Sequence, residues 1–386
     1  MFVNHVALKN WRNFKNAEAY LRDKTYIIGP NASGKSNFLD VFRFLRDISK
    51  PEGGGLQKAI RDRGGISKLR CLHHRQDSEV RIEVALGDSP DPASPTWRYI
   101  LGFKSEGKGS QRPAITTEQV WRGSEDKPLI SRPDAKDKKD SARLTQTFLE
   151  QINANRDFRE IADFFGAVNY LHLVPQLLKH ADKIGGNRLE DDPFGQGFLE
   201  RIAKCQAKAR DSRLAKIGKA LQAAVPHFAE IRYTPDEITG RPHLEARYEH
   251  HRPNAGWQRE DQFSDGTLRL LALLWSLFEG DSLLLLEEPE LSLNSAIVER
   301  IPLIFQKIQR SAKYRRQILI STHSEALLSN PGIDGRGVLL LAQDAEGSSI
   351  RPPDPRELKL IKSGLSIAEV LLPKAHPPKA EQLELF

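Results

Sequence analysis

The sequence predicts an α/β fold in which an antiparallel β lobe, a doubly wound parallel sheet and a helical insertion are combined. Near the start of the chain, a glycine-rich turn connects a short β-rich run to a helical pattern. From residue 262 onward, short apolar runs alternate with helical patterns, which is typical of parallel strands covered by helices. Between these regions, runs of alternating polarity separated by polar turns indicate antiparallel strands.

The composition excludes several classes of protein. The longest apolar stretch, residues 268–286, is interrupted by charged residues and a glycine, so we expect no membrane-spanning helix. The first residues show no basic region followed by an apolar one, so we expect no secretory leader. Cys71 and Cys205 lack the spacing of a metal site. We therefore expect a cytoplasmic protein, whose net charge of +7 suits contact with nucleic acid or an acidic partner.

The first third of the chain is rich in expected strands. Residues 2–8 alternate loosely in polarity and form the first, and residues 24–28 (KTYII) form the strand that enters the glycine-rich turn. Residues 37–48 follow the turn with apolar side chains at helical spacing, so we expect a helix there. Residues 123–140 are charged and contain proline, so we expect a loop. The strands of the antiparallel lobe are expected at residues 79–86, 97–103 and 115–121.

The central part of the chain interrupts the β pattern. Residues 141–165 and 197–225 are expected to be helices of an inserted region, and residues 243–248 another strand. In the last third, the expected helices and strands lie at residues 266–278, 282–286, 294–309, 317–321 and 337–342. The expected division of the chain is an N-terminal part at 1–140, a helical insertion at 141–226 and a C-terminal part at 227–386.

The glycine-rich turn Gly29–Ser36 (GPNASGKS) matches the pattern G-x-x-x-x-G-K-[ST] without a mismatch. Between a strand and a helix, such a turn surrounds a phosphate with backbone N–H groups and a helix N-terminus. Lys35 is expected to reach the β- and γ-phosphates, and the Ser36 hydroxyl to coordinate Mg²⁺. The alternative is a chance glycine-rich turn. The residues expected to contact the nucleotide here are Gly29, Asn31, Ala32, Ser33, Gly34, Lys35, Ser36 and Asn37.

A second candidate site is the apolar run at residues 283–286, which ends in two carboxylates, Glu287 and Glu288. A buried parallel strand delivers its C-terminal end to the ligand crevice of an α/β sheet. Glu287 is placed to hold the Mg²⁺ shell, and Glu288 to orient and polarise an attacking water. The alternative is a strand that ends at a solvated acidic turn.

Two further segments follow the same logic. His323 closes a buried strand, where a histidine can bind a γ-phosphate or a catalytic water, although a lone histidine is more often structural. Ser264, Asp265 and Gly266 begin an apolar helix, whose free N–H groups can bind phosphate. The alternative for Ser264 is an ordinary N-cap, and the two roles are compatible because they use the same donors.

Taken together, these motifs resemble the ATPase heads of the ABC superfamily in the RecF, SMC and OLD branch, above all its compact bacterial AAA family ATPases. The resemblance implies that GPNASGKS is the Walker A loop, LLLLEEPE the Walker B strand and FSDGT the signature. It further implies that His323 is the switch histidine, that Asn294 occupies the D-loop position and that Arg12 contacts a phosphate. ATP and Mg²⁺ are the cofactors it implies.

The sequence departs from the family pattern at three places. Glu287 stands where the family usually has Asp, Asn294 also replaces an Asp, and the signature reads SDGT rather than SGGQ. The metal geometry and the turnover are therefore open. Gln76 and Gln176 are both considered for the glutamine of the Q-loop.

The resemblance implies heads that pair with ATP between them, so that the signature of one copy caps the nucleotide of the other. We expect such an ATPase to act in DNA maintenance or phage defence through a separate effector protein, since the stretch after His323 is too short for a nuclease domain of about 100 residues. The alternative is a non-catalytic, nucleotide-gated scaffold or sensor that holds a partner toxin or nuclease. A P-loop kinase would leave the signature and the switch histidine without a role.

Contact with DNA is expected to be sequence-independent and salt-sensitive, and a solvated helix face is the equally weighted alternative. The first candidate surface is a basic helix with Arg201, Lys204, Lys208, Arg210, Arg213, Lys216 and Lys219. The second is a cluster of Lys58, Arg61, Arg63, Lys68 and Arg70.

Overall fold

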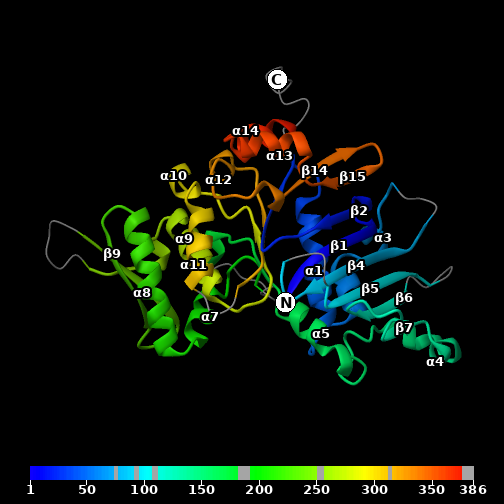
Figure 1. Ribbon diagram of the computed structural model, residues 1–386. Helices are drawn as coiled ribbons and strands as arrows, with labels where there is room; N and C mark the ends of the chain where they lie inside the picture. The colour runs from blue at the N-terminus through cyan, green and yellow to red at the C-terminus, as the bar shows by residue number, and fades with distance from the viewer. Residues whose placement is uncertain are drawn as a thin grey trace, which may run out of the picture. The chain divides into compact units, whose positions relative to one another are not determined.

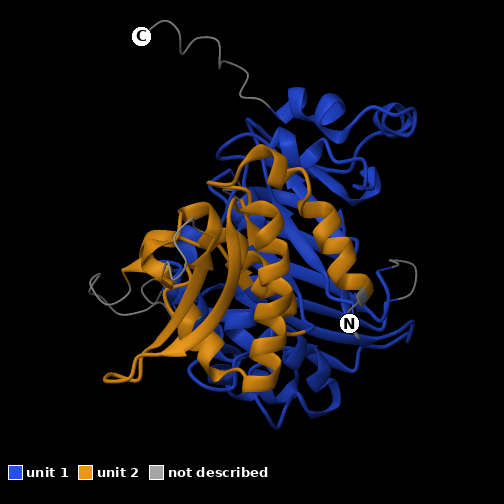
Figure 2. Ribbon diagram, turned by 90° about the vertical axis from the view of Figure 1, so that its left-hand side faces the viewer, with its two compact units in different colours: residues 1–169, 281–285, 314–386 blue, residues 170–280, 286–313 orange. Residues whose placement is uncertain are grey.

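The chain folds into a mixed α/β structure with antiparallel and parallel sheets, as Figure 1 shows for the computed structural model. The structure describes residues 1–73, 77–90, 95–106, 112–180, 192–249, 256–311 and 315–375. Two compact units, coloured in Figure 2, divide the chain. Unit 1 comprises Met1–Asn169, Asp281–Leu285 and Tyr314–Phe386, and unit 2 comprises Tyr170–Gly280 and Leu286–Lys313. These boundaries differ from the expected division of the chain, which was based on sequence pattern alone.

Unit 1 contains a six-stranded antiparallel sheet in the order β2-β1-β4-β5-β6-β7. Along β1, buried Val6 and Leu8 alternate with the half-exposed Ala7 and Lys9, so one face of the sheet is packed and the other is open. The expected antiparallel lobe and its first strand are thus confirmed. The strands are β1 Phe2–Trp11, β2 Phe14–Tyr20, β4 Val80–Gly87, β5 Trp97–Ser105, β6 Pro113–Arg122 and β7 Ile130–Arg132.

The second sheet has the order β15-β14-β3-β13-β12-β8. Strands β13 and β14 both pair in parallel with β3, so the carboxyl ends of these three strands lie at the same edge of the sheet. The expected parallel sheet is confirmed, and strands β8 and β12 continue across the boundary into unit 2. The strands are β3 Lys24–Ile28, β8 Asn169–Leu171, β12 Leu284–Glu287, β13 Ile318–Ser321, β14 Val338–Asp344 and β15 Gly347–Arg351.

The helix that follows the glycine-rich turn, α1, supplies much of the core of unit 1. Phe38, Phe42 and Phe44 are fully buried on it, and the ring of Trp11 packs 5.2 Å from that of Phe44. Each such side chain contributes about 1.5–3 kcal/mol through burial. The α-helices of unit 1 are α1 Lys35–Ser49, α2 Leu56–Asp62, α3 Ile66–Leu69, α4 Ala135–Lys139, α5 Arg159–Gly166, α12 Glu325–Leu328, α13 Pro355–Lys362 and α14 Ile367–Leu371.

The expected loop at residues 123–140 and the expected helix at 141–165 are each confirmed only in part. The first contains β7 and α4, and the second contains α5 and the 3₁₀ turns η1 Ser141–Thr145 and η2 Arg156–Phe158. The cause is tertiary. The fully buried carboxylate of Glu118 on β6 accepts hydrogen bonds from Arg132 at 2.8 Å and from the backbone N–H of Phe148 at 2.8 Å. Burying that carboxylate requires these donors, which hold both segments against β6.

Unit 2 contains the three-stranded antiparallel sheet β11-β10-β9, against which α8 packs. Its strands are β9 Phe228–Pro235, β10 Pro242–Tyr248 and β11 Gln258–Arg259. Its α-helices are α6 Pro175–Lys179, α7 Phe198–Lys204, α8 Ala207–Ala224, α9 Asp265–Phe278, α10 Ser295–Val298 and α11 Ile301–Ser311. The expected strand at 243–248 and the expected helix at 266–278 are confirmed. Among the helices that the structure describes, none is long and apolar enough to cross a membrane.

Two expected helices are each divided in two. The helix expected at 197–225 is interrupted at Cys205 and Gln206, whose backbones are extended. The helix expected at 294–309 is interrupted between α10 and α11. Pro302 accounts for this second break, because a proline ring collides with the carbonyl four residues earlier, and that carbonyl belongs to Val298, the last residue of α10.

Candidate phosphate-binding site

The glycine-rich turn of unit 1 has the geometry of an anion-binding loop. It begins after the buried end of β3 and leads directly into α1. Ala32 and Gly34 have φ values of 65° and 101°, so the backbone reverses curvature there and forms a concave row of N–H groups. The Lys35 ammonium donates to the carbonyl oxygens of Gly29 at 2.8 Å and Pro30 at 3.2 Å, which holds it at the loop. The expected strand, turn and helix are therefore confirmed.

The start of α1 favours an anion. Its first turn carries no acidic residue, and its N-cap, Gly34, supplies no side-chain cap. The positive end of the helix dipole at this position therefore favours a negatively charged ligand. The Ser36 side chain is exposed at this position. No side chain fits at Gly29, because a Cβ there would lie 2.6 Å from the carbonyl oxygen of Leu341.

Arg12, which is expected to contact a phosphate, is paired with a carboxylate. Its Nη2 donates to Asp40 Oδ2 at 2.6 Å, and Arg63 donates to the same carboxylate at 2.9 Å. Burial alone raises the pKa of Asp40, but the guanidinium groups of Arg63 and Arg12 outweigh burial and lower it. In this structure Arg12 is thus held by Asp40 on α1, and a phosphate contact by Arg12 stays a prediction.

His323 follows β13, the strand that pairs in parallel with β3. Because the glycine-rich turn follows β3 in the same way, both segments leave the same edge of the sheet. The N–H of Thr322 donates to the carbonyl of Ile27 at 3.1 Å, which keeps the chain before His323 beside the end of β3. The imidazole is exposed. The structure thus brings His323 to the edge from which the loop emerges.

The expected carboxylates, Glu287 and Glu288, belong to unit 2. Glu287 ends β12, and its Oε2 accepts a hydrogen bond from the hydroxyl of Tyr170. The backbone carbonyl of Glu287 lies 3.3 Å from His172 Nδ1. Sequence reasoning missed Tyr170, since nothing in the linear pattern relates it to a carboxylate more than a hundred positions away. The hydroxyl provides a fixed partner for a side chain that is one methylene longer than Asp.

Glu288 has a φ of 44°, although it is neither glycine nor asparagine and precedes Pro289. Such a conformation is disfavoured by about 1–3 kcal/mol, and backbone strain of this kind clusters at functional sites. The buried guanidinium of Arg269 lies in the field of Asp265, Glu290 and Glu288. Burial lowers the pKa of Arg269, and these three carboxylates oppose that effect. Arg269 was not identified from the sequence.

The signature residues and the D-loop position lie together in unit 2. A Cβ at Gly266 would lie 2.7 Å from the carbonyl oxygen of Ser292, so the start of α9 packs directly on the segment that follows Glu288. Ser264 is the N-cap of α9 and accepts the N–H of Thr267 at 3.1 Å. Asn294 in turn caps α10, accepting the N–H of Ala296 at 2.9 Å.

Asp265 replaces the first glycine of the usual signature and has two partners on α6. Gln176 donates to its Oδ2 at 2.6 Å, and Lys179 donates to its Oδ1 at 2.7 Å. Gln176, considered above for the Q-loop, is therefore a partner of the signature here. Gln76 lies outside the described residues.

The two basic surfaces are partly used within the protein. In the first, Arg210 lies over the ring of Tyr233 at 3.9 Å, and Arg213 lies over that of Trp275 at 5.4 Å. In the second, Arg63 is buried against Asp40. The residues of the first surface that remain exposed are Lys204, Lys208, Lys216 and Lys219.

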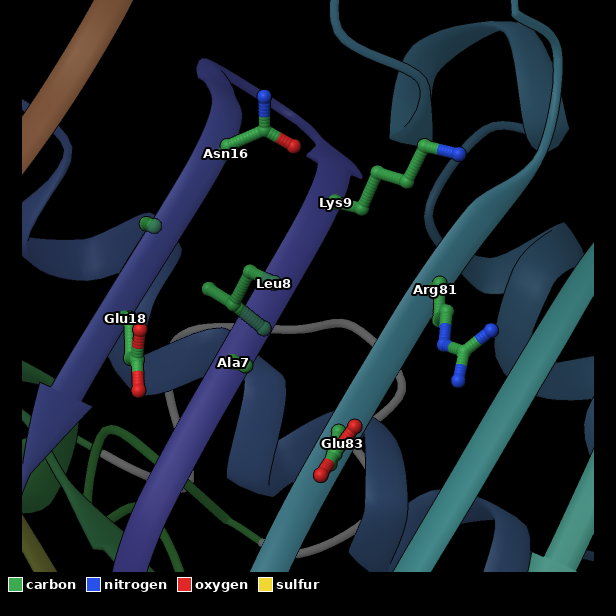
Figure 3. Close-up of a pocket in the computed structure, with 8 residues that line it drawn as sticks. Ala7, Leu8, Lys9, Asn16, Glu18, Arg81 and Glu83 are labelled. Carbon is green, nitrogen blue, oxygen red and sulfur yellow. The ribbon is translucent and has the colours of Figure 1, made fainter.

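A shallow hollow of about 400 Å³ lies on the open face of the antiparallel sheet of unit 1 (Figure 3). Its charged side chains come from β1, β2 and β4, and the cations Lys9 and Arg81 are balanced by Glu18 and Glu83. This balance favours neither an anionic nor a cationic ligand. None of the residues expected to bind nucleotide lines the hollow.

Comparison with protein families places residues 24–329 in the family described as "AAA domain, putative AbiEii toxin, Type IV TA system". Among curated proteins, 94 residues are 32% identical to the DNA replication and repair protein RecF of Roseiflexus castenholzii, covering 22% of this chain and 24% of that protein. Another 86-residue alignment is 35% identical to Endonuclease GajA of Bacillus cereus, covering 22% of this chain and 13% of that protein. The chain thus spans about a quarter or less of these relatives.

Two solved structures share the fold. An SMC head bound to the C-winged helix domain of ScpA has a TM-score of 0.56 at 14% identity, covering 94% of this chain and 100% of the other. An SMC head with an extended coiled coil, bound to the C-terminal domain of ScpA and derived from Pyrococcus furiosus, has a TM-score of 0.53 at 13% identity, covering 94% and 98%. The resemblance to RecF- and SMC-type heads is therefore confirmed, and with it the fold class.

Proposed function

This chain belongs to the AAA-domain family and has an ATPase head of the ABC, SMC and RecF type, and on that premise we propose that it binds and hydrolyses ATP. The observation that carries the proposal is the loop Gly29–Ser36. Its two left-handed residues, its uncapped helix and the buried Lys35 together form a cradle for phosphate. The GTP- and ATP-binding loops of P-loop proteins use the same parts.

In the proposed reaction, Lys35 and the loop N–H groups hold the β- and γ-phosphates, and Glu288 accepts a hydrogen bond from the attacking water. His323, at the edge of the sheet from which the loop emerges, stabilises the γ-phosphate. The carboxylate of Glu287 and the hydroxyl of Ser36 are hard oxygen donors of the kind that Mg²⁺ takes. Held there, Mg²⁺ would supply positive charge that offsets the negative charge of the phosphates.

We further propose that two copies pair when ATP is bound. Ser264, Asp265, Gly266 and Asn294 lie together in unit 2, and Ser264 and Asn294 are exposed there. An exposed helix start of this kind is suited to cap the γ-phosphate of a nucleotide held by a second copy. ATP then acts as the switch for assembly, and hydrolysis resets it.

The biological role we propose is DNA maintenance or phage defence, with a separate effector protein supplying any further chemistry. A DNA replication and repair protein and an endonuclease among the relatives support a role at DNA. The family description, which names a toxin and a toxin–antitoxin system, supports the second candidate, a nucleotide-gated scaffold that holds a partner toxin or nuclease without rapid turnover. The rate of ATP hydrolysis separates these two candidates.

Glu288→Gln and Lys35→Ala test the ATPase directly. We expect Glu288→Gln to retain ATP binding and to hydrolyse at least about a hundredfold more slowly, because only the water-orienting carboxylate is lost. Lys35→Ala should instead weaken ATP binding by tenfold or more, because a charge-assisted contact worth about 1.5–3 kcal/mol is removed. Phosphate release and equilibrium binding of a fluorescent ATP measure the two effects.

Wild-type hydrolysis by Glu288→Gln would contradict the role of that residue. No measurable hydrolysis by the wild type, together with tight ATP binding, would favour the scaffold.

A further inference from the structure

Asn13 lies in the tight turn between β1 and β2, directly after Arg12 in the sequence, and is half-buried. We propose that it is a positioning residue of the phosphate-binding loop, which holds the peptide between Ser33 and Gly34 in the orientation that binds nucleotide. This inference rests on the nucleotide binding proposed above. Neither the motif nor the comparisons assign it, because Asn13 is outside the loop sequence.

The contact that carries the inference joins the Asn13 side chain to the loop backbone. Its Nδ2 donates to the carbonyl oxygen of Ser33 at 3.2 Å. In a trans peptide the C=O and the following N–H point in opposite directions. Since the Ser33 carbonyl points toward Asn13, the N–H of Gly34 points away from it. In loops of this class the backbone N–H groups surround the phosphates, so Asn13 fixes the direction of one of those donors.

Gly34 makes such a restraint necessary. With a φ of 101° it occupies the left-handed region, and glycine passes between backbone conformations at little cost. The peptide before it is therefore free to rotate unless its carbonyl is held. Gly34 also makes the restraint sterically feasible, since a Cβ on this residue would overlap the Asn13 amide. Gly34 permits this loop conformation, and the hydrogen bond from the Asn13 amide stabilises it.

The Asn13 amide is itself held from two other elements. Its Oδ1 accepts a hydrogen bond from Asn37 Nδ2 on α1 at 2.8 Å, and its Nδ2 also donates to Ser348 Oγ on β15. The backbone carbonyl of Asn13 accepts the N–H of Ser348 at 2.7 Å. A Cβ at Gly347 would lie 2.6 Å from that same carbonyl. The Asn37 side chain and the backbone of the β14–β15 hairpin, both of which remain in a Ser348→Ala variant, therefore fix the turn and its amide in one position.

Asn13→Ala tests the proposal, with Ser348→Ala as the matched control. The control removes a hydrogen bond of the same side chain but leaves the contact with Ser33. We expect Asn13→Ala to bind Mg-ATP about tenfold more weakly, because the Gly34 N–H then loses its hydrogen bond to the charged phosphate. The same variant should bind AMP as the wild type does. AMP lacks the β-phosphate that the loop surrounds. Ser348→Ala should remain within about twofold of wild type for both nucleotides.

Hydrogen exchange without nucleotide gives a second readout that is independent of activity. Amides of residues 33–37 should exchange faster in Asn13→Ala, while those of β4 keep the wild-type rate. If Asn13→Ala does not fold, Asn13→Asp keeps the shape of the side chain and removes the donor.

Three results are decisive. Equal affinities of Asn13→Ala and wild type for Mg-ATP, or an equal loss for ATP and AMP, would overturn the positioning role. A wild-type protein that binds no ATP would overturn the proposed nucleotide binding itself.

Discussion

At the scale of single residues, Asp40 joins α1 to the turn between β1 and β2. The residue is 6% exposed, and its carboxylate accepts hydrogen bonds from both Arg12 and Arg63. Asp40→Asn keeps the shape of the side chain but removes the negative charge that Arg12 and Arg63 share. Arg63 keeps Asp47 as a second partner. We expect the free energy of unfolding at neutral pH to fall by about 3 kcal/mol. Urea unfolding followed by tryptophan fluorescence measures this change. Asp62→Asn, which removes the exposed partner of Lys58, is the control and should cost less than about 1 kcal/mol.

The pH dependence follows from the direction of the Asp40 shift. Its pKa is lower in the folded protein than in the unfolded chain, so its stabilising effect is present above the unfolded pKa of about 4 and is lost as the pH falls through the folded pKa. The difference between wild type and Asp40→Asn should therefore shrink at acidic pH. A difference that stays constant from pH 7 to pH 3 would mean that the charge of Asp40 contributes nothing.

At the scale of elements, the signature residues lie at the N-terminus of α9, which is well capped. Ser264 accepts the N–H of Thr267, and Asp265 is held by Lys179 and Gln176 of α6, so the helix start is rigid. We expect Mg-ATP to promote self-association of Glu288→Gln, and Ser264→Arg in that background to prevent it, because a long cation would occupy the space proposed for the second copy. Light scattering with and without Mg-ATP measures the mass.

Ser264→Thr is the matched control, because threonine keeps both the cap and the small size. Nucleotide binding should be unchanged in both variants. An ATP-dependent oligomer formed equally well by Ser264→Arg would contradict pairing through this surface.

At the scale of the whole molecule, the net charge of +7 bears on DNA binding. The exposed cations of α7 and α8 remain the candidate surface. A variant in which glutamate replaces Lys204, Lys208 and Lys216 should bind duplex DNA at low salt at least about tenfold more weakly. The change should be sequence-independent and should reduce the salt dependence. The control triple on α4, also exposed, is Lys136, Lys138 and Lys139. Fluorescence anisotropy with a labelled duplex measures both.

Equal losses in the two triples would indicate a net-charge effect rather than a site. No binding by the wild type at low salt would assign the positive charge another purpose. Cleavage of a plasmid by the same preparation with Mg²⁺ or Mn²⁺ would contradict the proposal that a separate effector supplies such chemistry.

The sequence by itself determined the parts of the protein that depend on neighbours in the chain. The strand, turn and helix around Lys35, the apolar strand before Glu287 and the capped helix after Ser264 all follow from local spacing and turn chemistry. A few consecutive residues are enough to specify these features, so they can be predicted without knowledge of the fold.

Tertiary structure alone decided the contacts between residues far apart in the chain. Arg12 is paired with Asp40, Tyr170 holds Glu287, and Asn13 reaches both Ser33 and Ser348. It also ordered the segments that pack on β6, where the sequence predicted a loop and one long helix. The physical reason is the same in each case. A buried polar group must find a partner, and which partner it finds depends on which strands and helices the fold places beside it.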